Sequence, residues 1–192
     1  MQHMSGRRAL MLALIASATA VAVAACSSAG VTTPSSSAAP AASKAFTSEW
    51  YGFSVNLSDE WSGTDATLDW NGEKLQGLTS PAFARFADAP SGRTLVAAAA
   101  PVAAGTELAD WRAAMVQAAP ASCSESASVE ETTLDGEPAL VWFATCGDGD
   151  AIKLATLHEG RGYMIFLDSQ TATDDEDRNV FETIRSSFRF SS

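Results

Sequence analysis

Residues 126–146 of this chain, SASVEETTLDGEPALVWFATC, contain two runs of strand-forming residues on either side of a tight-turn pair. The runs are Ser126–Leu134 and Ala139–Cys146, and the pair between them is Asp135-Gly136. An Asp-Gly pair accommodates the two positive φ angles of a two-residue hairpin turn at little steric cost. We therefore predict an antiparallel β-hairpin here and extend the fold outward from it.

More strands are predicted on both sides of this hairpin. Ala151–Leu157 and Tyr163–Leu167 flank a polar stretch, residues 158–162, and predict a second hairpin. Upstream, apolar residues alternate with polar ones from Phe53 through Val55 to Leu57, which is the period of a half-buried strand. Two further extended segments are predicted, Pro81–Phe86 and Arg93–Ala100.

Two amphipathic helices complete the predicted elements. The first covers Glu107–Ala119, with Thr106 as its N-cap and Pro120 as its stop. The second begins at Thr173, where Thr173–Glu176 matches a capping box and places acid at the positive end of the helix dipole. The apolar stripes are Leu108, Trp111 and Met115 in the first helix, and Val180, Phe181, Ile184 and Phe188 in the second. This order of elements predicts an α+β domain in which an antiparallel β-sheet is covered by helices.

The two ends of this domain carry short motifs of a known family. Residues 50–61 are WYGFSVNLSDEW and residues 181–188 are FETIRSSF. The pattern "YGFSV, short gap, W" and the closing "F-x-x-I-x-x-S-F" resemble the PsbP-like superfamily, which includes the LpqN-type lipoproteins of high-GC Gram-positive bacteria. The resemblance spans about residues 46–190. The sequence departs from the usual pattern before Trp61, where Asp59-Glu60 stands in place of a proline. The resemblance therefore does not define the conformation of the turn before Trp61.

The resemblance implies a central antiparallel sheet between helices. It also implies a binding or assembly role, because members of this superfamily are largely non-catalytic. The superfamily offers no set of catalytic residues to carry over to this chain.

The first 26 residues carry an export signal. Arg7 and Arg8 precede a largely apolar, uncharged run, Ala9–Ala25. The run ends in Val23-Ala24-Ala25, and Cys26 follows directly. This resembles the lipobox of bacterial lipoproteins, in which an aliphatic residue and two small residues precede a cysteine that accepts lipid. We predict cleavage before Cys26 and lipidation of its thiol, by palmitate among other chains. An uncleaved membrane helix and a secreted protein cut elsewhere are the alternatives.

The lipidated cysteine and a Ser/Ala/Pro-rich linker are predicted to connect the signal to the domain. We assign residues 1–25 to the signal peptide, 26–45 to the linker and 46–192 to the α+β domain. Ser27–Lys44 has no aromatic residue and one charge, so it buries too little surface to offset the entropy of ordering. We expect a disordered tether there.

The net negative charge of the chain limits the classes of molecule that it can bind. The chain has 12 basic and 23 acidic residues, a net charge of −11, and losing Arg7 and Arg8 leaves 10 − 23 = −13. Such a surface repels nucleic-acid phosphates and anionic lipid headgroups. We therefore expect no nucleic-acid binding, and membrane contact only through the lipid anchor.

Two cysteines remain once Cys26 is lipidated. A two-residue turn at Asp135-Gly136 pairs positions whose numbers sum to 271, and Cys123 and Cys146 sum to 269. A bulge or a slightly different turn therefore brings the two thiols within bridging distance. In an oxidising compartment we predict a disulfide, with a reduced pair as the alternative and a metal site as a poorer one.

The usual catalytic patterns are missing from the sequence. His158, beside Glu159, is the one histidine left after signal removal, and it is predicted to be a solvated turn residue. There is no Gly-x-Ser-x-Gly elbow and no glycine-rich phosphate loop. The acidic run Asp174–Asp177 is explained by helix capping, and Glu130-Glu131 by solvated strand positions. Gly147–Asp150 is more typical of a turn than of a calcium loop. No metal and no cofactor are expected.

Trp70 is the candidate binding residue. It lies in a polar, turn-like stretch, DWNG, where an exposed indole would suit a protein or glycan partner. The alternative is that it packs under its own loop. We predict a membrane-tethered extracytoplasmic lipoprotein that binds an envelope protein, lipid or glycan without catalysis. A cell-envelope hydrolase with a carboxylate acid/base pair is the second hypothesis, and a purely structural lipoprotein the third.

Overall fold

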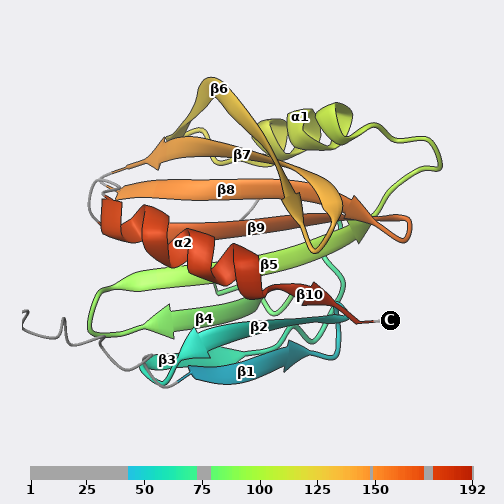
Figure 1. The fold of residues 1–192 in the computed structure, drawn as a ribbon. Helices are drawn as coiled ribbons and strands as arrows, with labels where there is room; N and C mark the ends of the chain where they lie inside the picture. The colour runs from blue at the N-terminus through green and yellow to red at the C-terminus, as the bar shows by residue number, and fades with distance from the viewer. Residues whose placement is uncertain (1–42, 73–78, 148, 171–174, 192) are drawn as a thin grey trace, which may run out of the picture. The chain divides into compact units, whose positions relative to one another are not determined.

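The strands form two antiparallel sheets (Figure 1). The computed structural model describes residues 43–72, 79–147, 149–170 and 175–191. The smaller sheet has the order β1-β2-β10, made of Ser43–Ser48, Phe53–Ser58 and Arg189–Phe190. The larger has the order β3-β4-β5-β9-β8-β7-β6. Its strands are β3 (Trp61–Thr64), β4 (Ala84–Asp88), β5 (Arg93–Pro101), β6 (Cys123–Leu134), β7 (Glu137–Cys146), β8 (Gly149–His158) and β9 (Arg161–Ser169).

Both predicted hairpins are confirmed. In the β6–β7 hairpin, Asp135 and Gly136 have φ angles of 49° and 88°, as the two-residue turn requires. In the β8–β9 hairpin the turn is Glu159-Gly160, and its strands are longer than predicted. β7 and β8 also pair with each other, so β6 to β9 form a continuous antiparallel meander.

A bulge in β6 brings the two cysteines into register. Leu134 pairs with Glu137 and Val129 with Trp142, but the register then shifts, and Glu125 pairs with Ala144. The shift changes the sum of paired numbers from 271 to 269, which aligns Cys123 with Cys146. The predicted disulfide between them is present.

The two helices lie on opposite faces of the larger sheet. α1 (Leu108–Ala118) places Trp111 against Gly162 of β9, and α2 (Asp175–Ser187) places Arg178 over the ring of Phe143 of β7. Phe143 pairs with Ile152 of β8, and Ile152 pairs with Leu167 of β9, so all three side chains lie on one face of the sheet. Gly162 is five residues before Leu167 on β9, an odd number. Alternation along a strand therefore puts the two contacts on opposite faces. Figure 1 shows α2 running across the near face and α1 beside β7.

The core is continuous from the small sheet to the large one. Phe53 of β2 stacks on Phe188, which follows α2, with ring centroids 4.8 Å apart. Tyr163 of β9 donates its hydroxyl proton to the carbonyl of Tyr51, 2.7 Å away. The largest side chains that are almost fully enclosed in the described part of the chain are Trp142, Tyr51, Phe53, Phe86, Phe188, Leu95, Leu134, Leu154, Met164, Leu167, Val55 and Val96.

The architecture differs from the single helix-covered sheet that the element order predicted. The helices have only 11 and 13 residues, and the three-stranded sheet packs on the same side of the larger sheet as α2, where Phe46 of β1 meets Phe86 of β4 at 4.3 Å. β1 begins at Ser43, so residues 43–45, predicted as the end of the linker, belong to a strand and not to a disordered tether.

Other details of the predicted elements also need correction. The segment predicted to begin at Pro81 forms a strand only from Ala84. Thr106 does not cap α1, because its hydroxyl donates to the carbonyl of Ala103 and the N-cap residue is Glu107. The capping residues Thr173 and Asp174 lie outside the described residues.

Candidate functional site

A polar cavity of about 330 Å³ lies at the β6 edge of the larger sheet. Its polar lining is Ser124, Glu125 and Ser126 of β6, Thr145 of β7, Asp150 of β8 and Arg178 of α2. Phe143 and Ala144 of β7 complete the walls. We call this space the β6–β7 cavity. Because four elements contribute to the cavity, no local sequence pattern predicts it.

The bulge in β6 opens this cavity. Ladder pairing stops at Glu125 and resumes at Val129, so Ser126 leaves the regular strand path opposite Phe143. The departure is stabilised locally. The backbone N–H of Ser128 donates to the Ser126 hydroxyl at 3.1 Å, and the guanidinium of Arg112 donates to the Ser126 carbonyl at 3.1 Å. The bulge thus replaces ladder hydrogen bonds and leaves room beside β7.

Arg178 lies over the aromatic wall of the cavity. Its guanidinium carbon is 4.3 Å from the centroid of the Phe143 ring, a distance suited to a cation–π contact. Arg93, Arg161 and Arg185 each form an ion pair with a carboxylate. Within the described part of the chain Arg178 forms none, so its in-plane N–H groups are available to a ligand.

The cavity's acidic side chain is already engaged with a neighbour. The Thr145 hydroxyl donates to Asp150 at 2.7 Å across the β7–β8 pair. Thr145, Asp150 and Phe143 occupy the face that α2 covers, by alternation along paired strands. One carboxylate, one guanidinium and several hydroxyls therefore meet in the same space.

Glu125 borders the cavity by its backbone, because its carboxylate is turned to the opposite face. One carboxylate oxygen accepts from the Lys153 ammonium at 2.5 Å and the other from the Trp142 indole N–H at 2.7 Å. The side chains of Glu125 and Lys153 are only 9% and 7% exposed. Arg112 of α1 covers the Trp142 ring at 5.1 Å. This buried charge network fixes the β6 segment that forms the cavity wall.

Asp168 of β9 belongs to the same face as that network. Burial raises the pKa of the Asp168 carboxyl, and the nearby charge of Lys153 lowers it by less. Lys153 therefore lies between two acids, of which Glu125 is the direct partner. The cluster is a neighbour of the β6–β7 cavity across the sheet and not part of its lining.

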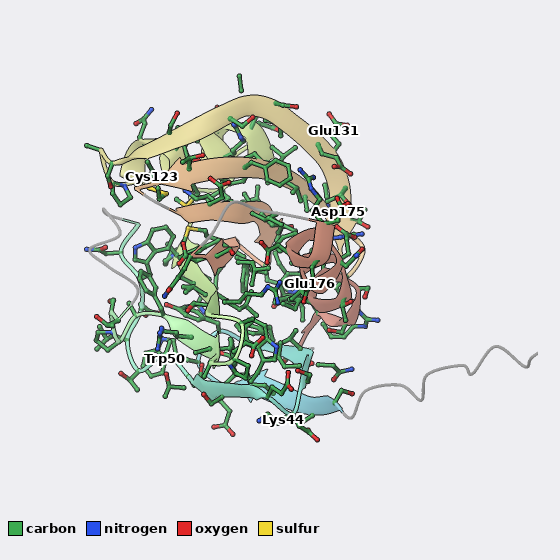
Figure 2. All side chains as sticks on the ribbon, turned by 90° about the vertical axis from the view of Figure 1, so that its left-hand side faces the viewer. Lys44, Trp50, Cys123, Glu131, Asp175 and Glu176 are labelled. Atoms are coloured by element: carbon green, nitrogen blue, oxygen red, sulfur yellow. A yellow bond between two sulfur atoms is a disulfide. The ribbon has the colours of Figure 1, made fainter. Side chains whose placement is uncertain are left out.

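The residues singled out from the sequence are distributed over the molecule. The disulfide Cys123–Cys146 lies at the end of β6, next to the cavity wall, and Glu131 lies farther along the same edge strand (Figure 2). Glu130 and Glu131 are exposed, as predicted. Cys26 and Asp148 are outside the described residues.

Trp70 is not the exposed indole that a binding role requires. It is 4% exposed and packs edge-on against Phe83 and Trp111, so the structure shows the alternative, in which Trp70 is part of the core. The exposed tryptophan is Trp50, at 44%, and Leu68 is 49% exposed. Trp50 was missed because the other aromatic residues of its motif, Tyr51, Phe53 and Trp61, are all buried.

His158 is not a solvated turn residue. It ends β8, its side chain is 19% exposed, and its ring stacks on Phe190 with centroids 3.9 Å apart. Its Nδ1 lies 2.9 Å from a carboxylate oxygen of Glu137. The acidic run of α2 also has a second role, since Asp177 is buried and forms an ion pair with Arg93.

Three other features bear on the kind of site. A second hollow of about 220 Å³ lies between β2 and α2, with Leu57, Trp61 and Ile184 in its walls. Among the described residues, no group of three or more His, Cys, Asp or Glu side chains is placed to hold a metal ion. In that same part of the chain, no helix is both long enough and apolar enough to cross a bilayer.

Comparison with solved structures identifies a similar fold. The chain is similar to the solution structure of the cyanobacterial PsbP protein (CyanoP) from Synechocystis sp. PCC 6803, with a TM-score of 0.51. The match covers 80% of this chain and 95% of that one, at 17% sequence identity. It shows a PsbP-like fold, as the sequence resemblance implied, and at this identity it shows the fold alone. No family model and no curated protein matches the sequence.

Proposed function

We propose that this chain is a lipid-anchored extracytoplasmic lipoprotein, of the LpqN type, whose domain binds an envelope component without catalysing a reaction. The observation that carries the proposal is the β6–β7 cavity. It combines a guanidinium without an ion pair in the described part of the chain, hydroxyls and an aromatic wall, and a disulfide joins the two strands β6 and β7 that form most of its lining. Polar groups on a rigid framework are what a recognition site needs.

The anchor part of the proposal rests on Val23-Ala24-Ala25-Cys26 and the apolar run before it. Each acyl chain contributes about 0.8 kcal/mol per buried CH₂, so two or more chains hold a protein durably at a membrane. The net charge of −11 favours this arrangement over a basic membrane-binding patch. The anchor and the cavity are independent parts of the proposal and need separate tests.

A photo-crosslinking experiment on intact cells tests the binding part. A photoreactive residue is placed at Ser124, in the cavity wall, and at Glu130, which is exposed on the same strand outside the cavity. We expect a reproducible crosslinked partner from position 124 that is absent from position 130. Equal yields at both positions, or no reproducible partner from position 124, would contradict a binding role for the cavity.

The hydrolase hypothesis requires two convergent carboxylates. Asp150 lines the cavity, while the carboxylate of Glu125 is held on the opposite face by Lys153 and Trp142. Within the described residues these two acids therefore do not face a common space. This arrangement supports binding over carboxylate-based hydrolysis as our proposal.

A further inference from the structure

We infer that the β6–β7 cavity binds a neutral sugar ring through its hydroxyl groups. The inference rests on the proposed function, because it names the ligand class of the same cavity. Three features of the cavity lead to it: the balance of donors and acceptors, the balance of charge, and the size.

The donors come mainly from Arg178. A guanidinium carries five N–H groups in a plane and accepts no hydrogen bond. The Phe143 ring covers one face of that plane, so the N–H groups at its edge remain for a ligand. Neighbouring hydroxyl oxygens on a ring can accept two of these N–H groups side by side, much as a carboxylate does.

The acceptors and the mixed groups come from the opposite walls. Ser124, Ser126 and Thr145 contribute hydroxyls. The Ser126 oxygen already accepts from the Ser128 N–H and the Thr145 proton is donated to Asp150, so Ser126 can still donate and Thr145 can still accept. Asp150 contributes acceptor oxygens, one of which already receives the Thr145 proton. A ligand facing these walls must both donate and accept, and sugar hydroxyls do both.

Among the lining residues that the structure describes, the charges cancel. Arg178 contributes one positive charge and Asp150 one negative charge, and the carboxylate of Glu125 is paired with Lys153 across the sheet. An anionic ligand would be attracted by Arg178 and repelled by Asp150. A zwitterion would need Asp150 as a full partner for its ammonium group, although Asp150 is already hydrogen-bonded to Thr145. A neutral hydroxylated ligand carries neither cost.

The volume fits a single ring. A hexopyranose has about a dozen non-hydrogen atoms, and the cavity lies at the small end of the usual range for ligand sites. A longer glycan would have to place one terminal ring inside and the remainder outside.

The test uses the full-length chain, purified in a detergent without a sugar headgroup. Methyl glucoside, methyl galactoside and methyl mannoside are titrated by calorimetry and saturation-transfer NMR, with glucuronate and glycine as charged comparisons. We expect at least one neutral pyranoside to bind with a Kd on the order of 1 mM or tighter. Raising the salt concentration should leave that Kd unchanged, because no net charge is paired.

Two arginine variants locate the binding. Arg178→Met removes the donors in the cavity, and Arg185→Met makes the same change farther along α2, where Arg185 pairs with Glu182. We expect Arg178→Met to weaken pyranoside binding about tenfold or more, the loss typical of a deleted hydrogen-bond donor to a ligand. Arg185→Met should leave the affinity unchanged.

Each other outcome overturns the inference in an identifiable way. Binding of glycine or glucuronate in place of the neutral rings would assign the cavity to charged ligands. Failure of all five probes, with a crosslinked partner still captured from position 124, would reject the sugar and leave the proposed binding function intact. Equal losses in both arginine variants would place the sugar elsewhere on the protein.

Discussion

Buried charge distinguishes this domain at the scale of single residues. Lys153 is enclosed and held at 2.5 Å by Glu125, whose other oxygen accepts from Trp142. Removing one partner of such a pair leaves the other charge buried and uncompensated. None of this is visible in the sequence, where Lys153 is the one charge in the predicted strand Ala151–Leu157 and Glu125 lies in a serine-rich run.

Lys153→Met tests the energetic role of the pair. The substitution keeps the length of the side chain and leaves the Glu125 carboxylate buried without its cation, so we expect a loss of about 3 kcal/mol in the free energy of unfolding. Urea denaturation measures it. Lys44→Met is the matched control, because Lys44 is exposed on β1, and it should change stability by less than about 0.5 kcal/mol. Equal effects in both variants would contradict the pairing.

The raised pKa of Asp168 leads to a prediction about how stability depends on pH. Burial raises its pKa in the folded protein above the usual value of 3.8, so the folded state holds this proton more tightly than the unfolded state does. Stability is therefore lost as pH rises from the unfolded pKa through the folded pKa. Asp168→Asn removes this loss. We expect the variant to gain stability relative to the parent chain as pH rises above about 4, as measured by urea denaturation across that range. A difference that shrinks with rising pH would contradict the burial effect.

At the scale of elements, the chain is predictable where structure is local. The β6–β7 hairpin follows from Asp135-Gly136, and the two-position mismatch of Cys123 and Cys146 required the bulge that the structure contains. β1 was missed because its residues SKAFTS continue the composition of the preceding low-complexity stretch, and its partner β2 supplies the pairing. The β6–β7 cavity was missed because it depends on that bulge and on the packing of α2, which are not local.

The disulfide is expected to stabilise the β6–β7 hairpin and the cavity wall together. Its cysteines are 23 positions apart, and closing a loop of this length contributes about 3 kcal/mol in the chain-entropy description. We expect the double variant Cys123→Ser, Cys146→Ser to lose roughly this amount in urea denaturation. The parent chain treated with a reductant provides the control and should match the variant. A variant as stable as the oxidised parent would contradict the role of the bridge.

The close packing of Trp111 on Gly162 leads to a prediction about the contact between α1 and the sheet. A Cβ at this position would lie 2.3 Å from Cε2 of Trp111, so Gly162→Ala should displace the indole. We expect a loss of about 1–3 kcal/mol, the usual cost of overpacking, measured by thermal or urea unfolding. Adding Trp111→Phe to Gly162→Ala provides space for the methyl group. The double variant should therefore lose less than the sum of the two single losses, and strict additivity would contradict the contact.

At the scale of the whole molecule, the fold is shown by observation, whereas the function is a proposal. A PsbP-like fold is shown by the sheets, the helices and the similar solved structure. The sequence could predict that fold from twelve residues at one end and eight at the other, because both motifs contain core residues, such as Phe53 and Phe188, whose rings stack. The ligand is not predictable in this way, since a shared fold places no particular side chains in a cavity.

The central claim is that a lipid chain on Cys26 holds this acidic domain at the membrane. Mass spectrometry of the native protein's amino-terminal peptide, combined with labelling by a palmitate analogue, tests it most directly. We predict a mature chain that begins at Cys26, carries the lipid mass and label, and partitions into detergent, while Cys26→Ala loses all three. A mature chain that begins at another residue, or a Cys26→Ala variant that keeps the label, would contradict the account.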